Sequence, residues 1–226
     1  MDSVPKKRME DGLASVVYQP DGRSSWLHFS GAVLTGGGSR RMGFPKSRLV
    51  VEGETLLRRQ LRLLREAGAS ELLASVNGRC PGSLEEGLSA RIVPDRIADS
   101  GPLAGIEALL QASQYPWVAI VAVDLPRLTV PFLRNLLQRV TSTSGVIPVH
   151  GGRLEPLCAV YPRLAAAPAT RLLELGRLEA TGFASTGIRE GWLHPWAIDG
   201  TPGGPLTNWN HPWDLVQNGR KPNLIQ

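Results

Sequence analysis

A glycine-rich segment that also carries cations stands at residues 34 to 46. It reads Leu34-Thr35-Gly36-Gly37-Gly38-Ser39-Arg40-Arg41-Met42-Gly43-Phe44-Pro45-Lys46. Glycines let backbone N–H groups approach a phosphate closely, and arginine or lysine side chains neutralise the charge that remains. A G-x-G-x-x-G fingerprint would need glycine at Arg41, and a Walker A sequence would need lysine at Phe44, so neither fits. The segment therefore predicts a phosphate-binding loop of a different kind.

Asp124 follows the most apolar stretch of the chain, which runs from Trp117 to Val123. Such a stretch predicts a central strand that is buried on both faces of a sheet. A carboxylate at the carboxyl end of this strand suits Mg²⁺, a hard cation that takes oxygen ligands and bridges to substrate phosphates. Together with the glycine-rich segment, this position predicts that Asp124 is a magnesium ligand.

Asn77 and Asp95 also follow apolar stretches. Their side chains offer hydrogen bonds to the edge of a base or to a ribose. The same residue types are common in turns, where they bond to the local backbone, so a purely structural role stays open for both.

The positive charge of the chain is concentrated around the glycine-rich segment. The 226 residues carry 25 basic and 20 acidic side chains, a formal net charge of +5. Eight of the basic and two of the acidic side chains lie between Gly36 and Arg65, whereas the other residues hold 17 and 18. We therefore expect an anionic substrate to bind near this segment. The segment lacks a series of interleaved aromatic residues, so a nucleic-acid partner is not expected.

Apolar strands and helices alternate through the first two thirds of the chain. Strands are expected at 32–34, 71–76, 91–93 and 117–123, and helices at about 55–67, at about 101–113 and from Thr129 onward. This alternation predicts an α/β fold of the Rossmann-like, doubly wound kind, a mostly parallel sheet with helices on both faces. Ligands bind to such sheets at the carboxyl ends of the strands. The arginines of the first helix are expected to form a solvated face: Arg58, Arg59, Arg62 and Arg65.

The remaining parts of the chain give weaker signals. Two strands are expected at 145–149 and 157–161, joined by residues 150–153, and a last helix at about 165–175. Residues 1–29 show no clear periodicity and are expected to be a disordered N-terminal extension, with residues 30–226 forming a single domain.

The longest unbroken apolar run has seven residues, whereas a membrane span needs roughly 20. No apolar stretch follows the early cations Lys6, Lys7 and Arg8, so neither a membrane span nor a signal peptide is expected, and the expected compartment is the cytoplasm. Cys80 and Cys158 are too few for a disulfide framework or a four-ligand zinc site and are expected to be structural or incidental thiols.

Several segments, taken in order along the chain, carry a family resemblance. The segment at 34–46 is similar to the signature LAGGxSxRMGxDK, and after it come Val76-Asn77-Gly78, Val93-Pro94-Asp95, Gly101-Pro102-Leu103-Ala104-Gly105-Ile106, Val123-Asp124-Leu125-Pro126, Glu155-Pro156-Leu157 and Asn208-Trp209-Asn210-His211-Pro212-Trp213-Asp214. Together these segments resemble the MobA-like nucleotidyltransferases. The Gly-Pro-Leu-Ala-Gly block and the late asparagine element are most similar to the molybdenum cofactor guanylyltransferases. Pro45 departs from the family, which usually has aspartate before the lysine.

The resemblance implies a Rossmann-like fold of the nucleotide-diphospho-sugar transferase kind. It further implies transfer of GMP from GTP to the molybdenum-pterin (molybdopterin) cofactor, release of pyrophosphate and Mg²⁺ as the metal cofactor. Residues implied in GTP binding are Leu34, Thr35, Gly36, Gly37, Gly38, Ser39, Lys46, Asn77, Asp95 and Asp124. Lys46, Asp124 and Arg41 are the implied catalytic residues, with Asp124 as the metal ligand, and Asn208 and Asn210 would contact the acceptor. Molybdoenzymes that accept the cofactor, or their chaperones, are further implied partners.

Two other interpretations stay open. A related magnesium-dependent nucleotidyltransferase would use CTP or another phosphorylated acceptor. A protein of a different class would bind the nucleotide or the cofactor as an adaptor without catalysis. The presence of both Lys46 and Asp124, the implied catalytic residues, argues against the adaptor.

Overall fold

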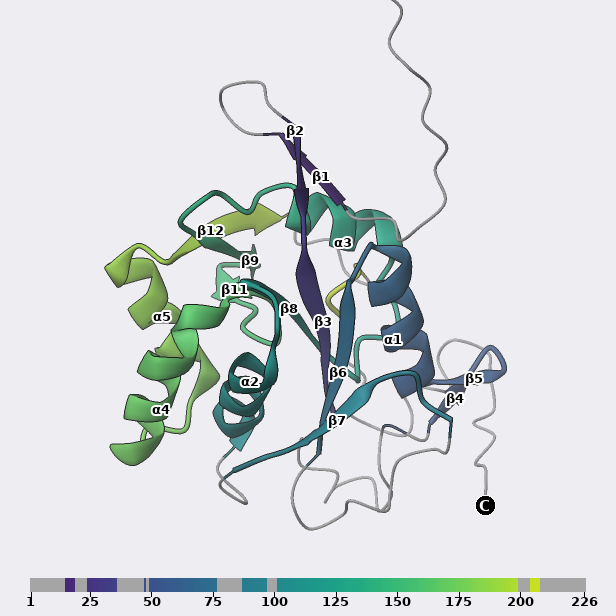
Figure 1. The fold of residues 1–226 in the computed structure, drawn as a ribbon, viewed down its shortest axis with the longest axis horizontal. Coiled ribbons are helices and arrows are strands. Elements are labelled where there is room, and N and C mark those ends of the chain that lie inside the picture. The colour runs from purple at the N-terminus through teal and green to yellow at the C-terminus, as the bar shows by residue number, and fades with distance from the viewer. Residues whose placement is uncertain are drawn as a thin grey trace, which may run out of the picture.

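A central sheet of eight strands organises the protein (Figure 1). The computed structural model describes residues 15–18, 24–35, 47, 49–76, 87–96, 101–198 and 204–207. The strand order is β10-β9-β11-β8-β3-β6-β7, and β12 pairs with β9. The strands are β3 (Phe29–Leu34), β6 (Glu71–Val76), β7 (Arg91–Pro94), β8 (Trp117–Ala122), β9 (Gly145–His150), β10 (Arg153–Leu154), β11 (Cys158–Pro162) and β12 (Leu193–Ile198).

Most neighbouring strands run in the same direction. β3 is parallel to both β6 and β8, β6 is parallel to β7, and β12 is parallel to β9. β11 lies between β8 and β9 and is antiparallel to both. The central strands are apolar and buried, as a sheet covered on both faces requires. The predicted doubly wound, mostly parallel sheet is confirmed.

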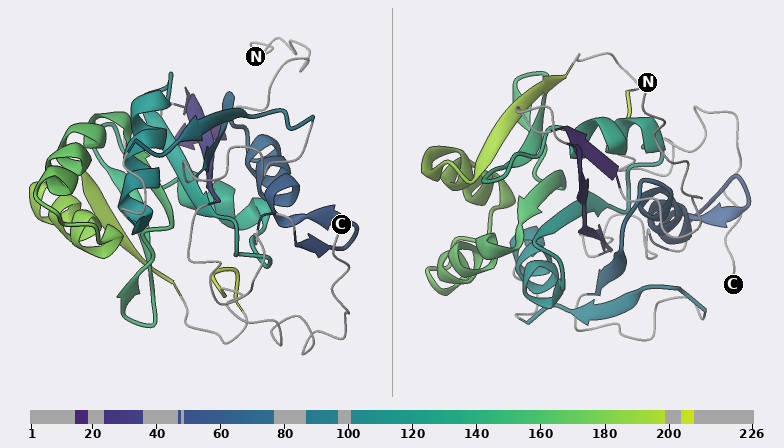
Figure 2. Two further views of the ribbon diagram at one scale, coloured as in Figure 1. Left: turned by 90° about the horizontal axis from the view of Figure 1, so that it is seen from below. Right: turned by 45° about the horizontal axis from the view of Figure 1, so that its top comes forward.

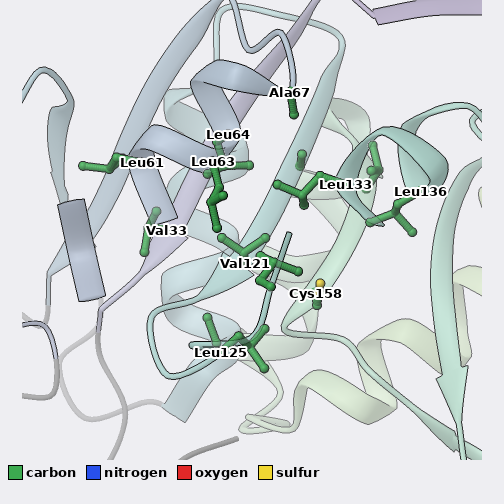
Figure 3. Packing of buried hydrophobic residues seen from close by; sticks show 14 of the residues in the cluster. Val33, Leu61, Leu63, Leu64, Ala67, Val121, Leu125, Leu133, Leu136 and Cys158 are labelled. Carbon is green, nitrogen blue, oxygen red and sulfur yellow. The ribbon is translucent and has the colours of Figure 1, made fainter. Parts of the chain in front are cut away.

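Helices cover the two faces of this sheet (Figures 1 and 2). One face carries α1 (Leu56–Glu66) and α3 (Val130–Leu137), and their leucines pack in one hydrophobic cluster with β3 and β8 (Figure 3). The other face carries α2 (Gly101–Ala112), α4 (Ala166–Glu174) and α5 (Ala180–Glu190), which share a second cluster. Thr55 and Thr129 cap α1 and α3, since their hydroxyls accept hydrogen bonds from the amides of Arg58 (3.3 Å) and Phe132 (3.4 Å).

The C-terminal third differs from the expectation. Residues 153–154 form β10, which turns back onto β9, so the predicted link at 150–153 is partly a strand. The sequence pattern also missed α5 and β12. Gly182 and Gly187 lower the helix propensity of α5. Gly187 is needed there, because a Cβ would lie 2.4 Å from the Trp192 ring.

The N-terminal region contains secondary structure within the part that is described. β1 (Ser15–Tyr18) and β2 (Ser24–Leu27) pair as an antiparallel ribbon, and β3 begins at Phe29. The described part of the predicted N-terminal extension therefore contains regular secondary structure. Cys158 is buried in β11, where burial raises the pKa of its thiol. Among the described helices, none is long and apolar enough to span a membrane.

A partly buried polar network closes the end of the sheet opposite the carboxyl ends of the parallel strands. The Glu71 carboxylate accepts hydrogen bonds from the Ser30 hydroxyl (2.6 Å), the Gln114 amide (3.0 Å) and the Arg91 guanidinium (2.7 Å). Burial acts to raise the pKa of Glu71, but these bonds together lower it below 4.5. The ionised carboxylate therefore stabilises the fold.

Glu71→Gln is expected to lower the free energy of unfolding by roughly 2 kcal/mol at neutral pH, because the amide loses the ion pair and one acceptor. Since the folded-state pKa is depressed, the Glu71 contribution is present above pH 4.5 and is lost as the pH falls further. Urea unfolding of both proteins at neutral pH and at a pH below this value tests the expectation. A difference in stability that does not shrink in acid would contradict it.

Candidate active site at the carboxyl edge of the sheet

The strand order reverses at β3, which lies between β8 and β6. Leu34, the last residue of β3, pairs with Ala122 at the end of β8 and with Ser75 near the end of β6. The Val123 amide donates to the Leu34 carbonyl over 3.0 Å, which brings the turn after β8 against the end of β3. Ligands of doubly wound sheets bind at such a reversal point. The predicted residues Leu34 and Thr35 therefore lie next to the turn that carries Asp124.

Thr35 is tied to the neighbouring strand. Its hydroxyl donates to the backbone carbonyl of Ser75 in β6. The side chain of Leu34 is buried in the core on the α2 side of the sheet. The side chain of Leu34 is therefore not available to a ligand at this edge.

Asp95 follows β7 at the same edge. Its amide donates to the Val76 carbonyl over 2.9 Å, so the residue sits beside the end of β6. The Oδ1 atom is buried and has no hydrogen-bond partner among the described residues. Burial raises the pKa of this carboxyl to about 6. Most buried polar groups have partners, so an unpartnered carboxylate oxygen indicates a place where a ligand donates a hydrogen bond.

Gly105 of α2 lies directly over this carboxylate. A Cβ on Gly105 would lie 2.7 Å from Leu34 Cδ2, 3.3 Å from Ser75 Oγ and 3.5 Å from Asp95 Oδ1. The Ser75 hydroxyl is also buried and has no partner in the described part of the chain. The helix therefore packs closely against the ends of β3, β6 and β7 at this position, and a side chain on residue 105 would press against Leu34 and lie against the two unpartnered polar atoms. Sequence reasoning did not assign Ser75 or Gly105 to the site, although Gly105 belongs to the Gly-Pro-Leu-Ala-Gly block that carries part of the family resemblance.

Asp124 lies in the turn after β8 and is partly buried. No group of three or more His, Cys, Asp or Glu side chains that could hold a metal was found among the described residues. Mg²⁺ at a protein carboxylate commonly keeps several waters and takes further oxygen ligands from substrate phosphates. The chemistry of this single carboxylate fits that arrangement, because Mg²⁺ is commonly bound by one or two carboxylates together with substrate phosphates.

Other predicted site residues lie outside the part of the chain that the structure describes, and their roles stay predictions: Gly36, Gly37, Gly38, Ser39, Arg41, Lys46, Asn77, Asn208 and Asn210.

One prediction about α1 was wrong. Arg59 does not belong to a solvated face, since its side chain is only 16% exposed. It donates a hydrogen bond to the carbonyl of Pro126, two residues after Asp124.

Known proteins share this sequence pattern and this fold. Residues 31–183 match the family model of the MobA-like NTP transferase domain. A probable molybdenum cofactor guanylyltransferase of Opitutus terrae is 36% identical over 198 residues, covering 85% of this chain and 95% of that protein.

Two solved structures show the same fold at lower identity. A nucleotidyl transferase from Methanothermobacter has a TM-score of 0.68 at 17% identity and covers 84% of this chain and 95% of its own. The 2-C-methyl-D-erythritol 4-phosphate cytidylyltransferase of Thermus thermophilus has a TM-score of 0.63 at 22% identity, covering 84% and 97%. With the family model spanning more than half of its residues, this chain belongs to the MobA-like NTP transferase family and is a nucleotidyltransferase.

Proposed function

We propose that this protein transfers GMP from GTP to the molybdenum-pterin cofactor and releases pyrophosphate, which yields the guanine dinucleotide form of the cofactor. The observation that carries the choice of guanine is the buried, unpartnered carboxylate oxygen of Asp95 under Gly105. The name of the Opitutus relative supports the same reaction.

The Asp95 carboxylate suits guanine for a chemical reason. Guanine presents two adjacent donors, N1–H and the 2-amino group, and an ionised carboxylate offers two acceptor oxygens at a matching distance. Cytosine presents its ring acceptor N3 beside its single amino group, so one carboxylate oxygen would face another acceptor. A carboxylate at this position therefore favours GTP over CTP.

Asp124 would hold Mg²⁺ together with the phosphates of GTP. When bound, this metal would offset the negative charge that develops on the α-phosphate and on the departing pyrophosphate. The described residues would position the reacting groups. The Asp95 carboxylate would hold the base, and the hydrogen bond from the Val123 amide to the Leu34 carbonyl fixes the turn of Asp124 against β3. Lys46, Arg41 and the glycine-rich segment would neutralise and align the triphosphate. The phosphate of the acceptor is already anionic, so no protein base is required for its attack.

A nucleotide panel tests this proposal. We expect pyrophosphate release with GTP and the molybdenum-pterin cofactor together, and much slower release when CTP or ATP replaces GTP. Turnover with CTP but not with GTP would overturn the choice of base and favour the cytidylyl alternative. Binding of GTP and cofactor without any pyrophosphate release would support the adaptor interpretation instead.

A further inference from the structure

Two neighbouring side chains of α1 bond to the turn that carries Asp124. The Gln60 amide nitrogen donates to the Leu125 carbonyl over 2.7 Å, and the Arg59 Nε donates to the Pro126 carbonyl over 3.1 Å. Both acceptors belong to the two residues that directly follow Asp124. The helix and the turn are more than 60 residues apart in the chain. The contacts are therefore tertiary and set the backbone of the turn against a rigid helix.

Both side chains are held from more than one side. Gln60 is fully buried. The Arg59 guanidinium also lies 3.6 Å from a Glu52 carboxylate oxygen and 3.7 Å from one of Glu54, in the hairpin of β4 (Val50–Val51) and β5 (Glu54–Thr55). Leu125 points into the cluster between α1, β8 and α3 (Figure 3). The turn is thus fixed by its apolar side chain and by two of its carbonyls.

Stability alone gives little reason for Gln60. Its Oε1 atom is buried without a hydrogen-bond partner among the described residues, which costs roughly 1–3 kcal/mol. The Leu125 carbonyl already accepts a second bond, from the Leu128 amide over 3.2 Å, so it would not be left unsatisfied without Gln60. An apolar side chain of similar size would fill the same space without an unpaired oxygen. What the amide adds is a defined position for the backbone after Asp124.

We propose that Arg59 and Gln60 are positioning residues that act through the Leu125 and Pro126 carbonyls on the Asp124 carboxylate. The inference rests on the proposed function, in which Asp124 binds Mg²⁺ and must meet the phosphates held beside β3. A displacement of about 1 Å in such a group lowers a rate by up to roughly a hundredfold. The two side chains therefore control the metal-dependent step without touching substrate.

The test compares Arg59→Gln and Gln60→Met with Arg65→Gln. Arg65 is a matched control because it lies on the same helix and also donates to a loop carbonyl, that of Ser89, over 3.2 Å. Three quantities are measured on the full chain: kcat and KM across a Mg²⁺ titration, binding of Mn²⁺ in the presence of GTP by electron paramagnetic resonance, and thermal stability. Hydrogen exchange of the amides of residues 123–128 reports the order of the turn directly.

We expect Arg59→Gln and Gln60→Met to lower kcat about tenfold, to weaken Mn²⁺ binding and to speed exchange in the turn, with KM for GTP little changed. Arg65→Gln should behave like the unmodified protein in all of these. Arg59→Lys should recover part of kcat, since an ammonium can still donate to the Pro126 carbonyl.

A loss of thermal stability with unchanged kcat and Mn²⁺ affinity would overturn the inference and leave the two residues a structural role. The proposed function can fail separately. If Asp124→Asn is inactive while the Arg59 and Gln60 variants match Arg65→Gln, only the positioning role is wrong. If Asp124→Asn keeps full activity and Mn²⁺ binding, both the metal assignment and the positioning role are wrong.

Discussion

Replacing Asp124 by asparagine is expected to lower kcat for nucleotidyl transfer by about a hundred- to a thousandfold while the fold survives. The amide keeps the size of the carboxylate but removes the charged oxygen that would hold Mg²⁺ beside the phosphates. The side chain is partly exposed in a turn, so its replacement removes no part of the hydrophobic core. The largest effect is therefore expected in the metal-dependent step and not in thermal stability.

The rate is measured as pyrophosphate release at saturating GTP and Mg²⁺, together with Mn²⁺ binding and a thermal melt. Glu66→Gln serves as the control, because Glu66 is 49% exposed at the end of α1 and its change removes the same charge away from the edge of the sheet. A rate for Asp124→Asn equal to that of the control would refute the metal assignment.

Asp95→Asn is expected to weaken GTP binding strongly and to reduce the preference for GTP over CTP. The asparagine side chain replaces one acceptor oxygen by an NH₂ donor, which would face a donor of guanine. Losing one charge-assisted hydrogen bond and burying an unmatched donor costs roughly 2–4 kcal/mol of binding free energy, or about 30- to 1000-fold in affinity. The affinity for tripolyphosphate, which has no base, should stay unchanged and provides an internal control.

The same carboxyl gives a pH dependence with a defined sign. Its pKa of about 6 means that Asp95 becomes protonated in the free protein as the pH falls through this value. Because only the ionised form accepts both guanine donors, GTP binding should be about tenfold weaker one pH unit below the pKa and flat above it. The Asp95→Asn variant should lack this dependence. An acid limb of the same size in the variant would assign the titration to another group.

Asp95→Asn should change thermal stability in the opposite direction from its effect on GTP binding. The folded-state pKa is raised above the ordinary value of 3.8, so burial of the ionised form costs stability at neutral pH, and this cost disappears below 3.8. Asp95→Asn removes the cost, and its melting temperature at neutral pH should equal or exceed that of the unmodified protein. A marked drop would indicate that the carboxylate has a structural partner.

Local sequence signals predicted the elements that position the site. β6 has the expected bounds because an apolar run meets Asn77-Gly78, and α2 starts where Gly101-Pro102 marks a first helical turn. Thr129 caps α3 as expected. β12 was not predicted because Pro195 interrupts its strand pattern. In the structure, β12 pairs with β9 along one side. A strand that is paired on one side can contain a proline.

Within the described part of the chain, the site residues that the sequence predicted lie at or just after the end of a strand. Asp95 and Asp124 were found because carboxylates at strand ends contribute little to a core. The roles of Gln60 and Arg59 were not predicted, because polar residues that alternate with leucines are common on the exposed face of any amphipathic helix. Their role depends on the distance between α1 and the turn after β8, a tertiary property that no local spacing encodes.

The insertion of β11 between β8 and β9 has a consequence for synthesis on the ribosome. β9 leaves the ribosome before β11, yet its place in the sheet lies beyond β11. The parallel strands β3, β6, β7 and β8 can therefore assemble with α1 and α2 first, while residues 145–150 can pair with β10 but cannot yet join the sheet through β11. Until residues 158–162 arrive, β8 presents an open apolar edge of the kind on which nascent chains pair and aggregate. We therefore expect misassembly during this interval to be limited by how soon β11 covers the edge of β8.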